Sequence, residues 1–220
     1  MPELQRLRAD HAAAVLAFEL ANRGYFAASI SDRGDEFFDQ FAERHSALLA
    51  EQEAGTGAFH VLVAEDGSVL GRFNLVFAGY RTAELGYRVA QDVAGRGVAT
   101  ATVRDLCELA AARYRLRTLR AAVSRTNVAS QKVLTKAGFV PAGPADPADL
   151  GLSQAAGISA TLTPHGQPIR PPGTKPSLAV RCARAGPFSG KSTGWAWRTS
   201  APTPSWISSC QEPRWQSSTG

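Results

Sequence analysis

The sequence predicts an α/β protein with a mixed, mostly antiparallel central sheet flanked by helices. Three strand-like runs follow one another, at 58–65, 68–78 and 82–90. Asp66-Gly67 between the first two is a strong signal for a two-residue hairpin, which makes that pair antiparallel. A helical pattern from Val98 to about Arg113 then precedes another strand-like run at 116–123. Because a helix separates this strand from 82–90, we expect these two strands to be parallel.

The first 57 residues predict one edge strand and two helices. Leu4–Arg8 alternates in polarity, and Asp10 follows as the expected cap of a helix rich in Ala and Leu that runs to about Asn22. After a loop at 31–35, apolar residues at helical spacing predict a second helix that ends near Gly55. His45 lies on or near the apolar face of that helix, so we interpret it as a packed side chain.

The end of the patterned region predicts one more helix and one more strand. Asn127 is the expected cap of a short helix, Gly138 ends it, and a strand starts at 139–142. The whole order is β-α-α-β-β-β-α-β-α-β, which is typical of a mixed sheet with helices on its faces. Cys107 lies on the inward face of the helix that begins at Val98, so we assign it to the core.

Composition excludes several classes of protein. Of the 220 residues, 44% are hydrophobic and 20% are charged, which is enough apolar sequence to bury a core. No apolar run approaches the roughly 20 residues that cross a bilayer, and the N-terminus has no apolar signal core, so we expect a cytoplasmic protein without membrane partners. The three cysteines form no CxxC pair, so neither a disulfide framework nor a metal site is indicated.

Charge divides the chain into two parts. Residues 1–150 hold 17 basic and 18 acidic residues, whereas residues 151–220 hold 7 basic residues and one acid. This basic tail also carries all four tryptophans and nine of the 13 prolines, and it is rich in Ser and Gly. We therefore expect a folded domain at 1–150 and a disordered tail at 151–220, and we expect no nucleic-acid partner for the domain. Nucleic-acid binding is a third possibility for the protein, and it rests only on the basic tail.

The tail has two interpretations. It is either a natural disordered extension, or the product of a change of reading frame near Leu150, because out-of-frame GC-rich codons yield Arg, Pro, Ser, Gly and Trp. Translating the other two frames from that codon distinguishes the two. The run Gly186–Ser192 is similar to a phosphate-binding loop, but it has three residues between its glycines instead of four, and no buried strand precedes it.

The most informative stretch is Val89–Ala101, in which a strand enters a glycine-rich turn that becomes a helix. Gly95 and Gly97 allow a tight bend and a close approach of a ligand to the backbone. The first amides of the new helix have no carbonyl partners, and the helix dipole adds positive potential, so the turn favours a pyrophosphate. The dinucleotide fingerprint GxGxxG is not satisfied, since Thr100 occupies its third glycine position.

A resemblance to a known family rests on this turn and two further motifs. Glu84-Leu85-Gly86-Tyr87 precedes the turn, and Asn127-Val128-Ala129-Ser130 with Gly138-Phe139 follows about thirty residues later. This arrangement resembles the GNAT acetyltransferase superfamily over residues 3–143, and more narrowly its Rim-type protein N-terminal acetyltransferases. The resemblance implies that 1–150 is a GNAT domain and that the turn holds the pyrophosphate of acetyl-coenzyme A, with no metal.

The resemblance also implies the residues that would bind the co-substrate. Val89 would touch the pantetheine arm, and Asn127 would lie beside the thioester end. The pyrophosphate would be held by Ala94, Gly95, Arg96, Gly97, Val98, Ala99 and Thr100. The family usually has Gln or Arg where this chain has Ala94, so a side-chain contact is lost there. Many members have a Tyr seven residues after the Asn, as the acid that protonates the leaving thiolate, and here that position is Leu134.

Transfer of an acetyl group to an amine needs a group that takes the amine proton and a donor for the thiolate. Glu84, on a central strand, is the candidate base, because partial burial raises the pKa of a carboxylate. Glu84 as a solvent-facing strand residue is the alternative. Ser130 is the candidate acid, and the alternative is that it only caps or packs its helix.

We therefore expect an acetyl-coenzyme A-dependent N-acetyltransferase that acts by direct transfer in a ternary complex. The acceptor is a primary amine, with a protein N-terminus favoured over a small molecule. GNAT folds usually end with a strand that inserts into the sheet. After Asp149 the sequence offers only small residues and then prolines, so we expect that strand to be missing or replaced, with Leu178–Val180 as the substitute. The alternative to an active enzyme is a protein that binds the coenzyme but is inactive, because the unusual C-terminal sequence spoils the acceptor site.

Overall fold

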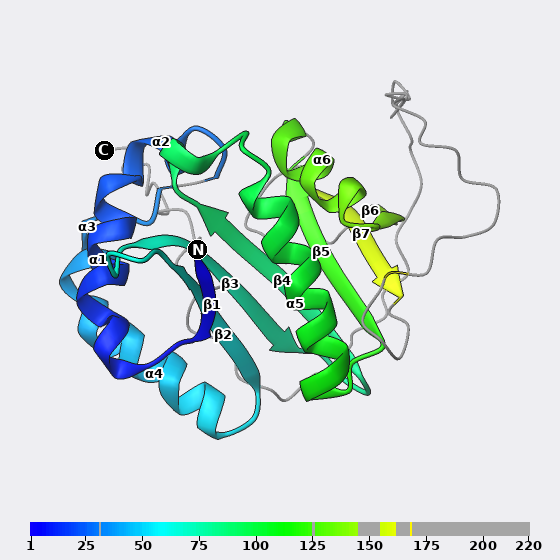
Figure 1. Cartoon of the computed structure of the whole chain (residues 1–220), viewed down its shortest axis with the longest axis horizontal. Coiled ribbons are helices and arrows are strands. Elements are labelled where there is room, and N and C mark those ends of the chain that lie inside the picture. Colours follow the sequence, from blue (N-terminus) through cyan, green and yellow to red (C-terminus); the bar gives the residue numbers. More distant parts are fainter. Residues whose placement is uncertain (31, 125, 145–154, 162–167, 169–220) are drawn as a thin grey trace, which may run out of the picture.

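The computed structural model describes residues 1–30, 32–124, 126–144, 155–161 and 168. These residues form one seven-stranded sheet with helices on both faces (Figure 1). The strands are β1 (Glu3–Arg6), β2 (Gly57–Val63), β3 (Val69–Phe77), β4 (Thr82–Val89), β5 (Thr118–Ser124), β6 (Val140–Pro144) and β7 (Ala155–Thr161). The helices are α1 (Ala12–Ala21), α2 (Arg23–Ala27), α3 (Asp35–Asp39), α4 (Phe41–Glu53), α5 (Val98–Tyr114) and α6 (Val128–Lys136), with 3-10 turns η1 (Ala9–His11) and η2 (Gln91–Val93).

The strand order is β1-β2-β3-β4-β5-β7-β6, and every pair is antiparallel except β4 with β5. The predicted edge strand, the β2–β3 hairpin and the parallel pair are therefore confirmed. At the hairpin, Gly67 has φ +83 and Asp66 Oδ1 accepts the amide of Ser68 at 2.9 Å. An Asp side chain that closes its own turn followed by a glycine with positive φ is the local reason for this hairpin.

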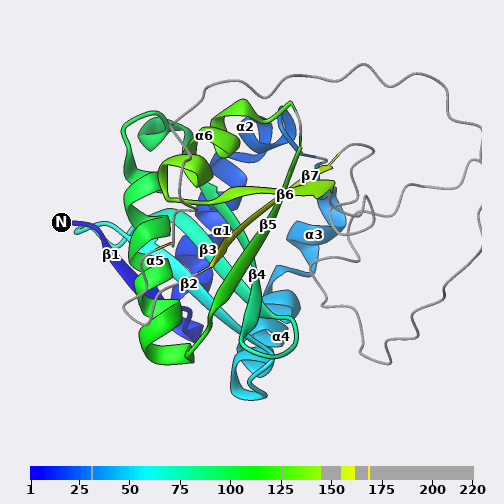
Figure 2. The ribbon, with the colours of Figure 1, turned by 90° about the vertical axis from the view of Figure 1, so that its right-hand side faces the viewer.

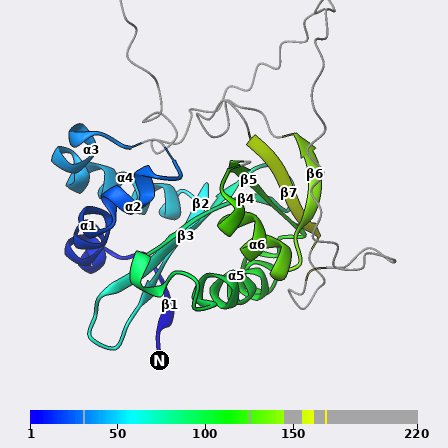
Figure 3. The same cartoon turned by 90° about the horizontal axis from the view of Figure 1, so that it is seen from above.

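The sheet separates two apolar cores. Helices α5 and α6 cover one face and α1 to α4 cover the other (Figure 3). On β4, Ala83 and Leu85 are buried toward α5 and α6. Because side chains alternate along a strand, Glu84 and Arg88 point to the opposite face. This alternation decides on which side of the sheet each predicted site residue lies.

Two local predictions near the N-terminus need correction. Asp10 does not cap α1, which begins after His11; it lies in η1, where Arg8 holds its carboxylate at 3.0 Å. The His11 ring accepts the amide of Arg8, and His11, which stands at the N-cap of α1, makes no side-chain capping hydrogen bond to that helix. The single second helix is divided at Gln40 into α3 and α4. His45 is buried and its Nε2 donates to the Arg8 carbonyl, which confirms it as a packed side chain.

Helix α6 has the ends that the sequence predicts. The side chain of Asn127 accepts the amide of Ser130 at 3.0 Å and so caps the first turn. Gly138 follows the last turn with φ +98, its amide donates to Thr135, and the next amide donates to the carbonyl of Leu134. These two bonds form a Schellman motif that ends the helix and leads the chain into β6.

The expected loss of the final strand is wrong. Residues 155–161 form β7, which pairs with β5 from Ser124↔Ala155 to Thr118↔Thr161 and with β6 on its other edge (Figure 2). A strand held on both sides gains its stability from main-chain pairing, which small residues permit, so a search for large apolar residues missed it. Leu178–Val180 and Gly186–Ser192 lie outside the described residues. The division at residue 150 and the two interpretations of the tail stay predictions, although β7 extends the sheet to Thr161.

Candidate functional site

The chain passes from β4 to α5 through a turn that contains Gly95 and Gly97. Both have a left-handed backbone, with φ +77 and +83, which residues with a Cβ rarely adopt. Apart from the glycine itself and its chain neighbours, no described residue has an atom within 4 Å of the position that a Cβ would occupy at either glycine. The backbone conformation therefore requires glycine, and the space above the turn is open. The amide of Gln91 donates to Asn22 Oδ1 at 2.8 Å, which fixes this turn against the end of α1.

The first amides of α5 point out of the helix without acceptors. Ala101 donates to the carbonyl of Gly97 at 3.0 Å, but the amides of Val98, Ala99 and Thr100 find no acceptor among the described residues. The first turn of α5 contains no acidic side chain that would compete for them. Three bare amides at the positive end of a 17-residue helix, above an open turn, fit a phosphate or pyrophosphate.

Strands β4 and β5 separate beside this turn. Their parallel register holds only three pairs, from Thr82↔Thr118 to Glu84↔Arg120, and no pair follows although β4 continues to Val89. The outer half of β4 and the outer half of β5 therefore have no main-chain ladder between them. We call the part of β4 beyond Glu84, which has no pairs with β5, the released edge. The main-chain groups of such an unpaired strand edge can bind an extended ligand. Val89, at the end of this released edge, leads directly to the glycine turn.

A pair of hydroxyl groups lies on the α6 side of the released edge. The Tyr87 hydroxyl is 2.8 Å from the Ser130 hydroxyl, and Asn127 holds the Ser130 amide at 3.0 Å. The Tyr87 ring stacks on Phe73 with ring centroids 5.8 Å apart. Burial raises the pKa of Tyr87 to about 12, against the opposing effect of the hydrogen bond with Ser130, so the phenol is protonated at neutral pH. The pair thus offers a proton donor in a partly dry setting.

The sequence pattern does not single out Tyr87 as a candidate site residue, although Tyr87 stands in the motif Glu84-Leu85-Gly86-Tyr87. The position from which many GNAT proteins supply a tyrosine is Leu134 here, and its side chain is fully buried in the core. Strand alternation could have found Tyr87, because it places Leu85 and Tyr87 together on the face toward the helix that begins after Asn127. The structure therefore brings Asn127, Ser130 and Tyr87 together.

Glu84 lies at the last pair before β4 and β5 separate. It is half-buried, stands opposite Val76 of β3 and Arg120 of β5, and points to the face that α1 to α4 cover. Tyr87 is three residues further along β4, about 10 Å away, and points to the other face. Glu84 and the Tyr87–Ser130 pair thus flank the opening between the strands from opposite sides. Its role as a base stays a prediction.

The Glu84 face also carries a buried ionic cluster. Glu19 of α1 is 2% exposed and contacts three guanidinium groups, those of Arg72 at 2.6 Å, Arg88 at 3.0 Å and Arg33 at 3.5 Å. Burial raises the pKa of Glu19, but these three cations outweigh it and lower the pKa to about 2. The cluster ties α1 to β3 and β4, and it keeps Glu19 ionised.

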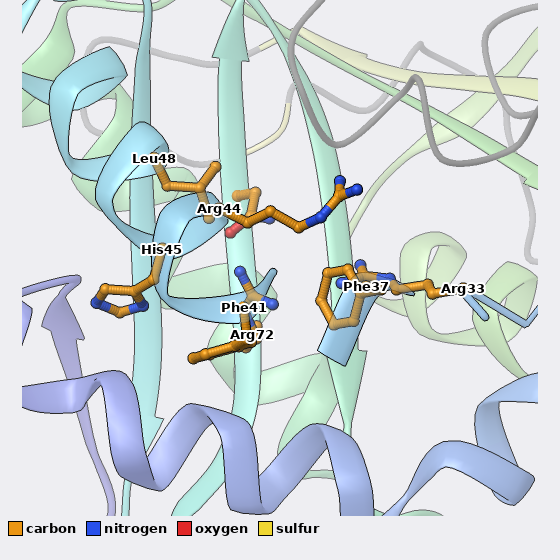
Figure 4. Close-up of a pocket in the computed structure, with 8 residues that line it drawn as sticks. Arg33, Phe37, Phe41, Arg44, His45, Leu48 and Arg72 are labelled. Atoms are coloured by element: carbon orange, nitrogen blue, oxygen red, sulfur yellow. The ribbon is translucent and has the colours of Figure 1, made fainter. Parts of the chain in front are cut away.

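A pocket adjoins this cluster between α3, α4 and β3, and we call it the arginine pocket (Figure 4). Three of its lining residues are Arg33, Arg44 and Arg72, and the lining residues that the structure describes include no acidic side chain. The guanidinium carbons of Arg33 and Arg44 lie 4.3 and 5.7 Å from the centre of the Phe37 ring. No local sequence pattern groups these three arginines, because they come from three separate parts of the chain.

Other kinds of site find little support in the part of the chain that the structure describes. No three His, Cys, Asp or Glu side chains there gather closely enough to hold a metal ion. None of the helices there combines the length and apolar character that crossing a bilayer requires. Cys107 is fully buried, and burial raises the pKa of its thiol to about 12, which agrees with its assignment to the core.

Comparisons with known proteins agree with this geometry. Residues 3–140 match the family described as the acetyltransferase (GNAT) domain. The chain is similar to the probable N-acetyltransferase YjcK of Bacillus subtilis (strain 168), with 27% identity over 133 residues that cover 56% of this chain and 72% of that protein.

Solved structures share the fold. The ribosomal-protein-S5-alanine acetyltransferase from Vibrio fischeri superposes with a TM-score of 0.66 and 19% identity, over 73% of this chain and 92% of that one. Mycobacterium smegmatis RimJ in complex with CoA-disulfide superposes with a TM-score of 0.62 and 23% identity, over 73% of this chain and 86% of that one. With the family match over more than half of its length, the chain belongs to the GNAT acetyltransferase family and is an N-acetyltransferase.

Proposed function

We propose that the protein transfers the acetyl group of acetyl-coenzyme A directly to a primary amine in a ternary complex, with a protein N-terminus as the favoured acceptor. The observation that carries this proposal is the juxtaposition of bare amides at Val98–Thr100 with the opening between β4 and β5. The amides suit a pyrophosphate, and the released strand edge suits an extended arm that ends beside Ser130. Acetyl-coenzyme A supplies the activated thioester.

The glycine turn would hold the co-substrate mainly through its backbone. Ala94 to Thr100 would surround the pyrophosphate, with Arg96 exposed and able to add a charge-assisted contact. Val89 would contact the pantetheine arm, and Asn127 would lie near the thioester. Ala94 supplies only its backbone, which suffices because the helix amides are the main donors.

The Tyr87–Ser130 pair would protonate the departing thiolate. Ser130 donates its hydroxyl proton to sulfur, the Tyr87 hydroxyl 2.8 Å away passes its proton to the Ser130 oxygen, and Tyr87 regains a proton from water, which restores both hydroxyl groups. A thiol has an ordinary pKa of about 8.5, so its thiolate is a fair leaving group and a single hydroxyl donor is enough. The Tyr87–Ser130 pair would thus protonate the thiolate, which Leu134 cannot do because its side chain has no acidic proton.

Glu84 would take the proton from the acceptor, either directly or through a water molecule. An ammonium ion has no lone pair, so attack on the thioester needs this deprotonation. Its half-buried position at the point where the strands separate supports the role. The acceptor would approach from the side of α1 to α4, opposite to the helix whose amides hold the pyrophosphate.

One of the solved structures named above is a ribosomal-protein-S5-alanine acetyltransferase and the other is RimJ in complex with CoA-disulfide, and the first of these supports a protein as acceptor. A small-molecule amine is the alternative within the same chemistry. An inactive coenzyme-binding protein, expected from the aberrant C-terminus, stays the other alternative, and the presence of β7 in the sheet speaks against it.

A turnover assay tests the proposal. The full chain is given acetyl-coenzyme A with a panel of peptides that have free N-termini, the same peptides with blocked N-termini, and small amines. Release of free thiol with free N-termini but not with blocked ones supports the proposal. Thiol release with small amines alone favours the alternative acceptor, and no release above the peptide-free rate contradicts the enzyme assignment for this substrate class.

A further inference from the structure

We propose that the arginine pocket binds a carboxylate of the acceptor, so that the enzyme prefers peptide N-termini with an acidic residue at the second position. This inference rests on the proposed function, because it extends the acceptor site. Its basis is the geometry of β3 and β4, the charge of the pocket, and the buried Oδ1 of Asn74, which has no hydrogen-bond partner among the described residues.

The pocket and Glu84 lie on the same face of the sheet. Arg72 and Asn74 of β3 stand opposite Arg88 and Gly86 of β4 and point, like Glu84, toward α1 to α4. Asn74 and Glu84 are diagonal neighbours across the two strands, a separation of about 7–8 Å. An acceptor whose amine reaches Glu84 would therefore have its next groups beside the pocket.

The charge of the pocket favours an anion. Three guanidinium groups line it, and Glu19, the carboxylate shared by Arg72 and Arg33, is not part of the lining. The Arg72 side chain is 8% exposed, so its charge acts where solvent screens it weakly. Guanidinium forks match carboxylates in shape as well as charge, and they would repel a second ammonium ion on the acceptor.

A neutral polar group completes the lining. Asn74 Oδ1 is buried and has no hydrogen-bond partner among the described residues. A half-turn about its Cβ–Cγ bond would present the Nδ2 donors to a ligand instead. The cavity volume of the pocket is about 20 Å³. This is room for about one water molecule or one oxygen atom of a ligand. A buried polar side chain without a hydrogen-bond partner beside such a space indicates that a water molecule or a ligand binds there.

The separation between Glu84 and the pocket selects the kind of carboxylate. In a free α-amino acid the amine and the carboxyl carbon are held on one carbon, within about 3 Å. An acidic side chain on the second residue starts one Cα–Cα step of about 3.8 Å further away, which suits the span of about 7–8 Å between Glu84 and Asn74. We therefore assign the pocket to an acidic second residue. Polyamines and N-termini followed by Lys would be poor acceptors.

The test compares peptides that are identical except for the second residue, which is Asp, Asn or Lys. For the full chain, kcat/KM with the Asp peptide should exceed that with the Asn peptide by about ten-fold, the size of a charge-assisted contact, and the Lys peptide should be the poorest. Equal values for Asp and Asn, or a preference for Lys, overturn the inference. Free aspartate and spermidine, tested in parallel, should be poorer than the Asp peptide, and a better rate with either also overturns it.

Variants of Arg44 connect the preference to the pocket. Arg44 lies on α4 outside the Glu19 contacts, so its replacement leaves that cluster intact. Arg44→Gln should lower the ratio of kcat/KM for the Asp peptide to that for the Asn peptide toward one, and Arg44→Glu should favour the Lys peptide. Arg113→Gln removes one exposed charge at the end of α5 and should keep the wild-type ratio. An unchanged ratio in both Arg44 variants overturns the inference.

Equilibrium binding separates this inference from the proposed function. Fluorescently labelled Asp and Asn peptides are titrated with the full chain in the presence of coenzyme A, where no transfer occurs. Tighter binding of the Asp peptide, lost in Arg44→Gln, supports the pocket even if turnover is absent, in which case only the catalytic proposal fails. Equal binding of both peptides overturns the pocket even if both are acetylated.

Discussion

The hydroxyl of Tyr87 lies 2.8 Å from the hydroxyl of Ser130, although the two residues are 43 positions apart. Tyr87 comes from the released edge of β4 and Ser130 from the first turn of α6, whose start Asn127 fixes by capping. The pair thus forms only when the sheet and α6 are both in place. The pair contains a protonated hydroxyl group, whereas Leu134, which is buried, has no group that could donate a proton.

Tyr87→Phe should lower kcat by about ten-fold and leave KM for acetyl-coenzyme A within about two-fold, because removing one hydrogen bond to a donor costs about 1 kcal/mol or more. Ser130→Ala should lower kcat at least as much. The double variant should lose less than the sum of the two free energies, since both act on one proton. Steady-state kinetics of the three variants provides the test.

An acetyl donor with a more acidic thiol distinguishes proton donation from packing. Such a thiolate needs less protonation as it leaves, so the deficits of Tyr87→Phe and Ser130→Ala should shrink with this donor. A deficit of the same size with both donors would mean that the pair only supports the structure.

Glu84→Gln removes the proposed base while keeping the shape of the side chain. We expect kcat to fall by about 10² to 10⁴, the usual contribution of a general base, with little change in the affinity for acetyl-coenzyme A. The rate of the variant should rise with pH, because only acceptors that are already deprotonated can react. Thr82→Val, on the same face of β4 two residues earlier, is the matched control and should retain activity. A Glu84→Gln enzyme with wild-type kcat and pH profile contradicts the assignment.

Glu19→Gln tests the ionic cluster that joins α1 to the sheet. The variant leaves three guanidinium groups close together without their shared carboxylate, and breaking a buried ion pair in this way costs about 3–5 kcal/mol of unfolding free energy. Urea denaturation at pH 7 measures the loss. Glu65→Gln, which removes an exposed carboxylate paired with the N-terminus, should change the unfolding free energy by less than about 1 kcal/mol. Equal effects of the two variants would contradict the structural role of Glu19.

His60 makes the stability depend on pH above the range in which carboxylates titrate. Burial lowers the pKa of His60 from its ordinary 6.5 to about 4, and its ring is 2% exposed. Between these pH values the unfolded chain binds a proton that the folded protein excludes, so stability falls as pH drops through 6.5 toward 4, by about 3 kcal/mol in all. Glu19 acts in a lower window: its lowered pKa adds stability above its ordinary 4.5 that is lost as pH falls toward 2.

Urea denaturation of His60→Gln at several pH values tests this prediction. The variant should lose most of the slope of unfolding free energy between pH 6.5 and 4, and it should keep the wild-type behaviour between pH 7.5 and 8.5. A slope in the variant that equals that of the wild type would assign the effect to other groups.

The sequence predicts most of the fold for local reasons. The Asp66-Gly67 turn, the Asn127 cap and the Gly138 stop each depend on hydrogen bonds within a few residues, and all three are confirmed. The missing-strand prediction failed because β7 is held by pairing with β5 and β6, and its small side chains carry no apolar period. Strand pairing between residues that are far apart in the sequence is not visible in the pattern of a short segment.

The candidate site shows the same contrast. The glycine turn could be predicted because positive φ and a helix start leave direct marks in the sequence. The Tyr87–Ser130 pair and the arginine pocket could not, since they join residues from different elements whose approach depends on the assembled sheet. Asp10 illustrates the limit even at short range, because the chain forms the 3-10 turn η1 over Ala9–His11 and α1 begins only after it.

Isothermal titration calorimetry measures whether the amides beyond Gly97 hold the pyrophosphate of acetyl-coenzyme A. The full chain should bind acetyl-coenzyme A, and Gly97→Val, which forces a β-branched residue to φ +83, should weaken binding by about ten-fold or more. Gly79→Val introduces the same strain at φ +83 in the β3–β4 loop, and it should bind like the wild type. Absence of binding by the folded wild-type chain, or equal affinity in Gly97→Val and Gly79→Val, would contradict the account.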